Sequence, residues 1–213
     1  MAARGYGQYC GFARALELVG ERWALLIIRD LLSGPHRFGE LQRGLPKVPS
    51  NILTARLKEL EEAGIVRRRA RPRPPGGVVY ELTQDGKDLE GPIIALGRWG
   101  AKRLGEKRPD EIVTEDSLAS ALRTIFRPER AGDDDIAFEL RFGEIVTNAQ
   151  VRGGTVVVGR GPSPKPDLVV EGQPAIQLML SREMTAKEAL KNGTVKIRGK
   201  RALLDRFVEL FAI

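Results

Sequence analysis

Apolar residues recur at helical spacing through the first third of the chain. This pattern predicts four helices, at residues 10–19, 21–31, 38–45 and 50–63. The second is apolar around most of its circumference, so we expect it to be buried as the central helix. In the fourth, Leu53, Leu57 and Leu60 form one apolar stripe, and Ser50 is a good N-cap.

A different pattern follows Gly64. Two strands are expected at residues 65–70 and 78–82, joined by a turn rich in proline and glycine. Thr83 can then cap a further helix that runs towards Gly105, and Pro92 should kink or restart it. The order of helix, turn, helix and hairpin predicts a winged helix-turn-helix for this half of the chain.

The second half predicts an α+β layer, a smaller unit with one sheet and helices on one side. A helix is expected at residues 117–126, and Thr185 with Glu188 forms a capping box that opens a later one. The remaining segments read as strands at residues 136–142, 145–151, 155–159, 168–170 and 195–198, and helices at 176–180 and 202–211.

Length and charge support this division. A chain of 213 residues suits two ordinary domains, here expected at residues 1–109 and 110–213. Residues 1–110 hold 20 Lys and Arg against 13 Asp and Glu, whereas the remainder holds 15 of each. The excess positive charge of the first half favours a polyanion as its partner.

Several classes of protein are excluded or disfavoured. The single cysteine, Cys10, rules out an internal disulfide framework, and with one histidine, His36, we expect no metal site. A Ser-His-Asp hydrolase would depend on His36 alone. The second half offers no carboxylate pair, metal cluster or glycine-rich phosphate loop, so we expect no enzyme and no cofactor. No apolar stretch approaches a membrane span and no signal segment follows Met1, which favours a cytoplasmic protein with no membrane partner.

The fourth helix and the hairpin supply a candidate surface for double-stranded DNA. Asn51, Ala55 and Lys58 lie opposite the leucine stripe, where small and hydrogen-bonding side chains suit a major groove. The hairpin carries five arginines within residues 67–73, which would pair with phosphates. An ordinary amphipathic surface helix remains the alternative for the helix alone. The predicted DNA contacts are Arg37, Lys47, Ser50, Asn51, Thr54, Arg56, Lys58, Arg67, Arg68, Arg69, Arg71 and Arg73.

Over residues 8–104 the chain resembles the HxlR family of bacterial winged-helix transcription regulators. The resemblance is carried by Tyr9-Cys10 to Gly20-Glu-Arg-Trp23, Arg37-Phe38-Gly-Glu-Leu41, Leu53-Thr-Ala-Arg56-Leu57 and Tyr80-Glu-Leu-Thr83. It implies a homodimer that binds operator DNA, with the segment from Ser50 as recognition helix and residues 67–73 as wing. It also implies a dimer interface made by the N-terminal helix and the helix after Thr83. The alternative is that Trp99 and Leu104 pack only against the second half of their own chain.

Cys10 matches a cysteine position found near the start of many members of that family, some of which sense oxidants or electrophiles through it. A helix N-terminus can lower the pKa of a thiol, which makes a redox role physically reasonable. The alternative is a small, buried packing residue.

Residues 115–213 resemble the sterol carrier protein fold in a short form, most clearly after Asp167 through Met184-Thr-Ala-Lys-Glu-Ala-Leu and Gly193-Thr-Val-Lys-Ile-Arg-Gly199. The resemblance implies a pocket for an apolar molecule between sheet and helices, unless side chains fill it. Its candidate lining residues are Phe138, Leu140, Phe142, Ile176, Met179, Met184, Phe207 and Phe211.

These observations predict a dimeric DNA-binding transcription regulator, a repressor, whose second domain senses an apolar small molecule. The alternative is a lipid or acyl carrier that uses the winged helix for dimerisation or docking. An enzyme on the sterol-carrier scaffold is a third class, for which the sequence offers no catalytic residues.

Overall fold

The computed structural model describes residues 5–71, 76–105 and 108–211 and divides the chain into two compact units, Met1–Leu96 and Gly97–Ile213. The sequence suggested a division near Asp110, and in the structure it falls inside a helix, Glu90–Ala101. Each unit has its own hydrophobic core.

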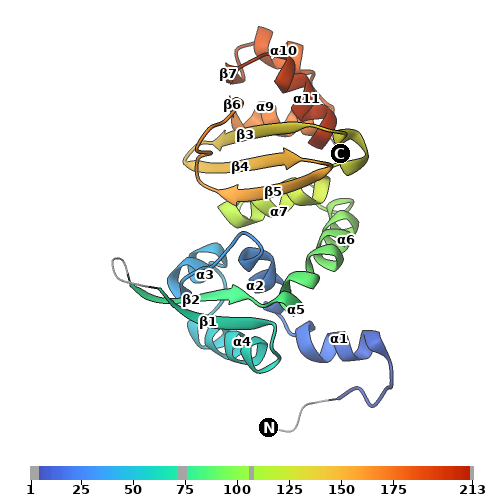
Figure 1. Ribbon diagram of the computed structural model, residues 1–213, viewed down its shortest axis with the longest axis vertical. Helices are drawn as coiled ribbons and strands as arrows, with labels where there is room; N and C mark the ends of the chain where they lie inside the picture. Colours follow the sequence, from blue (N-terminus) through green and yellow to red (C-terminus); the bar gives the residue numbers. More distant parts are fainter. Residues whose placement is uncertain (1–4, 72–75, 106–107, 212–213) are drawn as a thin grey trace. The chain divides into compact units, whose positions relative to one another are not determined.

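The N-terminal unit is a helical group with a hairpin beside it (Figure 1). Its elements are α1 (Gly11–Val19), α2 (Ala24–Leu31), α3 (Phe38–Gly44), α4 (Ser50–Glu62), β1 (Val66–Arg71), β2 (Gly77–Leu82), α5 (Gln84–Asp88) and the start of α6 (Glu90–Ala101). The expected helices and the hairpin are thus confirmed, with small shifts of their ends.

The core of this unit is built on α2 and α4. Ile27 and Ile28 of α2 are fully buried, and the stripe of Leu53, Leu57 and Leu60 on α4 is buried against them in one cluster. Burial of apolar surface stabilises such contacts by about 25 cal/mol per Å² removed from water, so they hold α4 firmly against α2. The predicted leucine stripe is therefore confirmed.

A glycine ends α4 and turns the chain into the hairpin. Gly64 has φ of 73°, and the N–H groups of Gly64 and Ile65 donate to the carbonyls of Glu61 and Leu60. This is the Schellman arrangement, which satisfies the last carbonyls of a helix and needs a left-handed residue. It leads directly into β1, which pairs antiparallel with β2.

Two helix boundaries differ from the sequence expectations. Ser50 is the first helical residue and Pro49 occupies the N-cap, so Ser50 does not cap α4. The helix after Thr83 is interrupted at Leu89 rather than at Pro92. Pro92 lies in the first turn of α6, where a missing N–H costs no intrahelical hydrogen bond. Thr83 itself caps α5, because its Oγ1 accepts from the N–H of Gly86 at 3.1 Å.

The C-terminal unit is a mixed five-stranded sheet in the order β5-β4-β3-β6-β7, covered by helices (Figure 1). All neighbouring strands are antiparallel except β3 and β6, which run parallel. The elements are α7 (Glu115–Ile125), α8 (Pro128–Ala131), β3 (Asp135–Phe142), β4 (Ile145–Arg152), β5 (Thr155–Arg160), β6 (Leu168–Glu171), α9 (Gln173–Leu180), α10 (Ala186–Lys191), β7 (Lys196–Gly199) and α11 (Ala202–Phe211).

The core of the C-terminal unit lies between one face of the sheet and helices α7, α9 and α11. Phe138 of β3 is fully buried, and its ring centroid is 5.3 Å from that of Phe207 and 6.1 Å from that of Phe211. Phe126 joins this cluster at 5.5 Å from Phe211. Tilted and edge-on aromatic pairs at such distances pack densely. Aromatic rings therefore occupy the layer between sheet and helices at this point.

Candidate nucleic-acid interface

Helix α4 presents a polar face away from its buried leucines. Asn51, Thr54 and Lys58 are all exposed, as the helical pattern predicted. The Oγ1 of Thr54 donates to the carbonyl of Ser50 at 2.8 Å, and Nζ of Lys58 lies 3.6 Å from a carboxylate oxygen of Glu62. Lys58 is still 72% exposed, so this pair leaves its ammonium accessible. These are side chains that can reach base edges and phosphates in a major groove.

Arg56 differs from the rest of the predicted set on α4. Its guanidinium forms ion pairs with Glu59 on the same helix and, at 3.1 Å, with Glu21 in the connection between α1 and α2. The side chain is only 17% exposed. Arg56 thus ties α4 to the preceding part of the fold, and contact with DNA would require it to leave these carboxylates.

The hairpin β1–β2 with its connecting turn, called the wing below, carries the arginines on both of its faces. Arg67 and Arg69 both donate to the carboxylate of Glu81 on β2, at 2.9 and 2.8 Å. Arg68 points the other way and pairs with Glu61 at the end of α4. The three guanidinium groups are half exposed or more, so they are oriented by the glutamates and remain accessible to a polyanion.

Glu81 and Glu61, the two carboxylates that pair with arginines of the wing, are both ionised. Burial alone would raise the pKa of Glu81, but the hydrogen bonds and charges of Arg67 and Arg69 outweigh it and lower the pKa below its ordinary value. The hydrogen bond from Arg68 is the largest effect that lowers the pKa of Glu61. Both carboxylates therefore stay charged at neutral pH and reduce the net positive charge of the wing.

The end of the wing holds the remaining predicted arginines. Arg71 pairs with Gly77 through the strand backbone and is exposed, and within the described residues its side chain has no hydrogen bond or ion pair. Arg73 lies outside the described residues. Of the predicted wing contacts that the structure describes, Arg71 is thus the one whose charge is not shared with a glutamate.

Arg37 and Lys47 lie at two different places. The Nη2 of Arg37 donates to the carbonyl of Gly76 at 2.8 Å, so Arg37 supports the wing from α3. Lys47 is exposed in the segment that leads into α4. The sequence did not single out the partners Glu21, Glu61 and Glu81, which orient several of the predicted DNA contacts.

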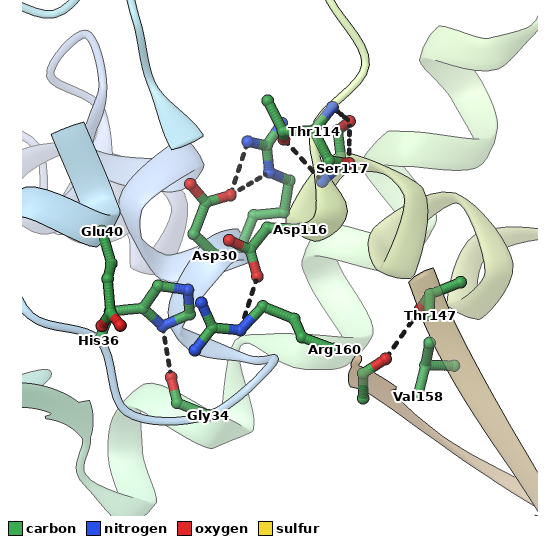
Figure 2. A network of polar contacts seen from close by, with 12 residues as sticks. Asp30, Gly34, His36, Glu40, Thr114, Asp116, Ser117, Thr147, Val158 and Arg160 are labelled. Atoms are coloured by element: carbon green, nitrogen blue, oxygen red, sulfur yellow. Dashed lines mark hydrogen bonds and ion pairs between the residues drawn. The ribbon is translucent and has the colours of Figure 1, made fainter. Parts of the chain in front are cut away.

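His36, the single histidine of the sequence, is buried. Its Nδ1 lies 2.7 Å from the carbonyl oxygen of Gly34, a contact drawn in Figure 2. Its backbone forms a short antiparallel bridge with Tyr80, through N–H to carbonyl contacts of 3.0 and 2.8 Å. His36 therefore joins the helices to the wing and serves the fold.

Cys10 is exposed at the N-cap of α1, so it is not the buried packing residue that was the alternative. Hydrogen bonds from the backbone N–H groups of Ala13 and then Phe12 lower the pKa of the thiol below its ordinary value. A thiol with these properties ionises more readily than a free cysteine and is open to reagents.

Apolar side chains are exposed on α1 and α6. Phe12 is 73% exposed, and α6 has no buried residue, with Trp99 at 56%. Leu104, which follows α6, is 80% exposed. The alternative in which Trp99 and Leu104 pack only against the second half of their own chain is therefore wrong.

In the C-terminal unit, seven of the eight predicted lining residues are buried core: Phe138, Leu140, Phe142, Ile176, Met179, Phe207 and Phe211. Met179 and Met184 also line an open pocket of about 410 Å³. Arg130, Arg182, Asp205 and Glu209 line it as well. The lining thus combines apolar side chains with charges of both signs.

A buried polar cluster lies elsewhere in that unit and has no role in the pocket. Asp116 of α7 is 3.8 Å from Nε of Arg160 on β5, and Thr114 with Ser117 forms the capping box of α7 (Figure 2). The Asp116–Arg160 pair joins α7 to β5, and the capping box satisfies the N-terminus of α7 itself.

Within the described residues, none of the helices has the length and apolar character that a membrane crossing requires.

Comparison with known proteins gives matches to the first half of the chain. A family model described as HxlR-like helix-turn-helix matches residues 18–108. The uncharacterised HTH-type transcriptional regulator Rv3095 of Mycobacterium tuberculosis is 45% identical over 91 residues, which cover 43% of this chain and 57% of that protein. The chain therefore spans little more than half the length of this relative.

Two proteins of Bacillus subtilis match over most of their own length. The uncharacterised HTH-type transcriptional regulator YvaP is 36% identical over 91 residues, which cover 43% of this chain and 84% of YvaP. The structure of the reduced transcriptional regulator YodB is 34% identical, with a TM-score of 0.41, and the match covers 47% of this chain and 100% of that one.

Proposed function

The chain belongs to the HxlR-like helix-turn-helix family, and on that basis we propose that it binds operator DNA as a homodimer and represses transcription. The observation that carries the proposal is the exposed polar face of α4, with Asn51, Thr54 and Lys58, on the helix to which Arg68 of the wing is paired. A helix of this kind enters the major groove, and a basic wing contacts the neighbouring phosphates.

The proposed dimer is formed by α1 and α6. Their exposed Phe12, Leu96 and Trp99 would be buried between two copies of the chain. A two-fold dimer places two recognition helices on successive major-groove faces, which are roughly 34 Å apart. The operator is therefore expected to be a pair of inverted half-sites.

The proposed sensor is the C-terminal unit, which we interpret as sterol-carrier-like. An apolar effector would bind in the pocket that Met179 and Met184 help to line, and it would favour one dimer geometry over another. Operator affinity would then change with the spacing of the recognition helices. The proposal assigns catalysis to no residue of the chain.

One alternative has an observation in its favour. The same pocket suits a lipid or acyl carrier in which the winged helix provides dimerisation or docking. Such a carrier does not need the arginine-rich wing. Native mass spectrometry separates the two: lipid retained at stoichiometric level by a protein that has no affinity for DNA would favour the carrier.

The direct test is to incubate the purified protein with sheared genomic DNA of its host at moderate salt and to sequence what is retained. We expect enrichment of a discrete, nearly palindromic site. Retention without enrichment, abolished by modest added salt, would reduce the first half to a general polyanion surface and overturn the proposal.

The dimer is tested separately by sedimentation of the parent protein and of Phe12→Ser and Trp99→Ser. Both exposed positions can lose their rings without opening a core cavity. We expect a dimer that each substitution weakens. A parent protein that stays monomeric at the concentrations used for DNA binding would contradict the interface.

A further inference from the structure

A pocket of about 360 Å³ lies in the N-terminal unit, at the start of the proposed recognition helix. It is lined by Arg22, Trp23, Lys47, Pro49, Ile52 and Arg56. Its volume is that of a small-molecule site, for which 300–1,000 Å³ is typical. The residues come from three separate segments, which are the connection into α2, the segment before α4, and α4 itself.

The charged residues that line the pocket all have the same sign. Arg22, Lys47 and Arg56 are positively charged, and among the described residues no acidic one lines the pocket. Glu21 and Glu59 engage Arg56, so they fix its position and balance part of its charge. Three cations gathered around one hollow favour a negatively charged occupant.

Arg56 contributes a second observation. Its Nε is buried and, within the part of the chain that the structure describes, has no hydrogen-bond acceptor. A buried donor without an acceptor is unfavourable, and native proteins rarely leave one. Because Nε is buried, an oxyanion in the pocket would supply this acceptor only after the Arg56 side chain shifts towards it.

The remaining walls are apolar and aromatic. Pro49 and Ile52 lie on one part of the lining, and the guanidinium carbon of Arg22 lies 5.0 Å from the centre of the Trp23 ring. Trp23 has φ of 81°, a left-handed conformation that is strained for a residue with a side chain. Strain of this kind persists where the surrounding structure enforces it, and it clusters at ligand sites.

We propose that this pocket binds a small organic anion, an aromatic carboxylate, and that the bound anion lowers affinity for DNA. The carboxylate would contact the cations, and its ring would contact Trp23 and Ile52. The regulatory half of this inference rests on the proposed function. Ile52 is adjacent to Asn51, so an occupant would lie against the end of α4 that is proposed to enter the groove.

Binding can be tested without DNA by nuclear magnetic resonance on the full chain. The protein has two tryptophans, Trp23 and Trp99, so the indole N–H of Trp99 is an internal control. Benzoate should shift the Trp23 signal saturably and leave Trp99 unchanged. Benzylamine, with the same ring and the opposite charge, and inorganic phosphate, an anion without a ring, should bind at least about tenfold more weakly.

Two results would overturn the ligand assignment. One is no saturable shift with benzoate. The other is an equal response to phosphate, which would mean that the cations bind any oxyanion, including a DNA phosphate, without use of the apolar wall. Calorimetric titration of benzoate gives the same comparison independently of the indole signals.

Variants locate the site. Arg22→Gln and Lys47→Gln should each weaken benzoate binding about tenfold or more, because both positions are exposed and the loss of charge does not open the core. Arg14→Gln is the matched control, since Arg14 is an arginine on α1 that does not line the pocket. Equal loss in all three variants would show general electrostatic attraction and overturn the site.

The regulatory half is tested on the complex with DNA. Benzoate should weaken retention of the enriched duplex by the parent protein and should do so about tenfold less effectively for Arg22→Gln. If benzoate binds and DNA retention does not change, the proposed effect on DNA binding is wrong, but the assignment of the anion site is upheld. If the protein retains no DNA at all, the proposed function fails, and the resonance and calorimetric results still decide the site.

Discussion

Arg68 and Glu61 join the wing to α4, the proposed recognition helix. The Nε of Arg68 in β1 donates to both carboxylate oxygens of Glu61 in the last turn of α4, at 3.0 Å each. Together with the Schellman ending at Gly64, this pair determines how the wing departs from the helix. The two parts proposed to contact DNA are therefore oriented by a bond between them.

The ion pair between Arg68 and Glu61 should make the stability of the folded protein depend on pH. The pKa of Glu61 is lowered in the folded protein by Arg68, so its contribution to stability is present above the unfolded value and is lost as the pH falls through the folded pKa. We expect Glu61→Gln to lower the melting temperature slightly at pH 7, and the difference to vanish at acid pH. Glu144→Gln, at an exposed turn, is the control for the loss of charge.

Substitutions on α4 and at the end of the wing should affect DNA binding in different ways. Asn51→Ala and Lys58→Ala should reduce discrimination between the operator and random duplex, by about 1–3 kcal/mol for a lost base contact. Arg71→Ala should weaken both duplexes alike and lower the slope of log affinity against log salt by about one. Equal losses on both duplexes for both kinds of variant would contradict this division, and electrophoretic mobility shifts over a salt series measure it.

Glu81 should limit the affinity of the wing. Glu81→Gln removes the carboxylate that Arg67 and Arg69 share, so both guanidinium groups gain freedom to contact phosphates. We expect tighter binding to random duplex and a steeper salt dependence. Glu144→Gln again controls for net charge, and weaker binding by Glu81→Gln would mean that the carboxylate chiefly positions the arginines.

Cys10 should ionise at lower pH in the folded chain than in the unfolded one, because the N–H groups of Ala13 and Phe12 stabilise its thiolate. The rate of reaction with iodoacetamide follows the thiolate fraction, so its midpoint should move to higher pH when the protein is unfolded in urea. The same midpoint in both states would remove the basis for a redox role.

Phe207 should be a major contributor to the stability of the C-terminal unit. It is fully buried and its ring is 5.0 Å from that of Phe211 and 5.3 Å from that of Phe138. Phe207→Ala should cost about 3–5 kcal/mol in the free energy of unfolding. Val157→Ala, at a 69% exposed position of β5, should cost far less, and urea unfolding compares the two.

Much of the fold could be predicted from the sequence because local signals carry it. The capping box of Thr185 and Glu188 and the cap at Thr83 are confirmed, as are the alternating strands of the sheet. The short helix α8 was not predicted, since four residues are too few for a periodic pattern. The interruption at Leu89 was placed at Pro92, because a proline signals a break most strongly in an interior turn.

The candidate site was harder to predict, because ion-pair partners lie far apart in sequence. Arg56 meets Glu21, which is 35 residues away, and nothing in the local pattern indicates that contact. Glu81 could have been found, since the hairpin places it directly opposite Arg67. The register of the hairpin alone therefore indicates that Glu81 balances part of the arginine charge.

The parallel pairing of β3 with β6 limits how far the C-terminal unit can fold while the chain is still being synthesised. The strands β3, β4 and β5 are linked by tight hairpins and can pair as soon as they leave the ribosome, but β6 begins only at Leu168. Until that segment is made, β3 has an unpaired edge that exposes N–H and carbonyl groups beside Phe138 and Leu140. A nascent or truncated chain that stops before β6 therefore carries an aggregation-prone strand at what becomes the centre of the finished sheet.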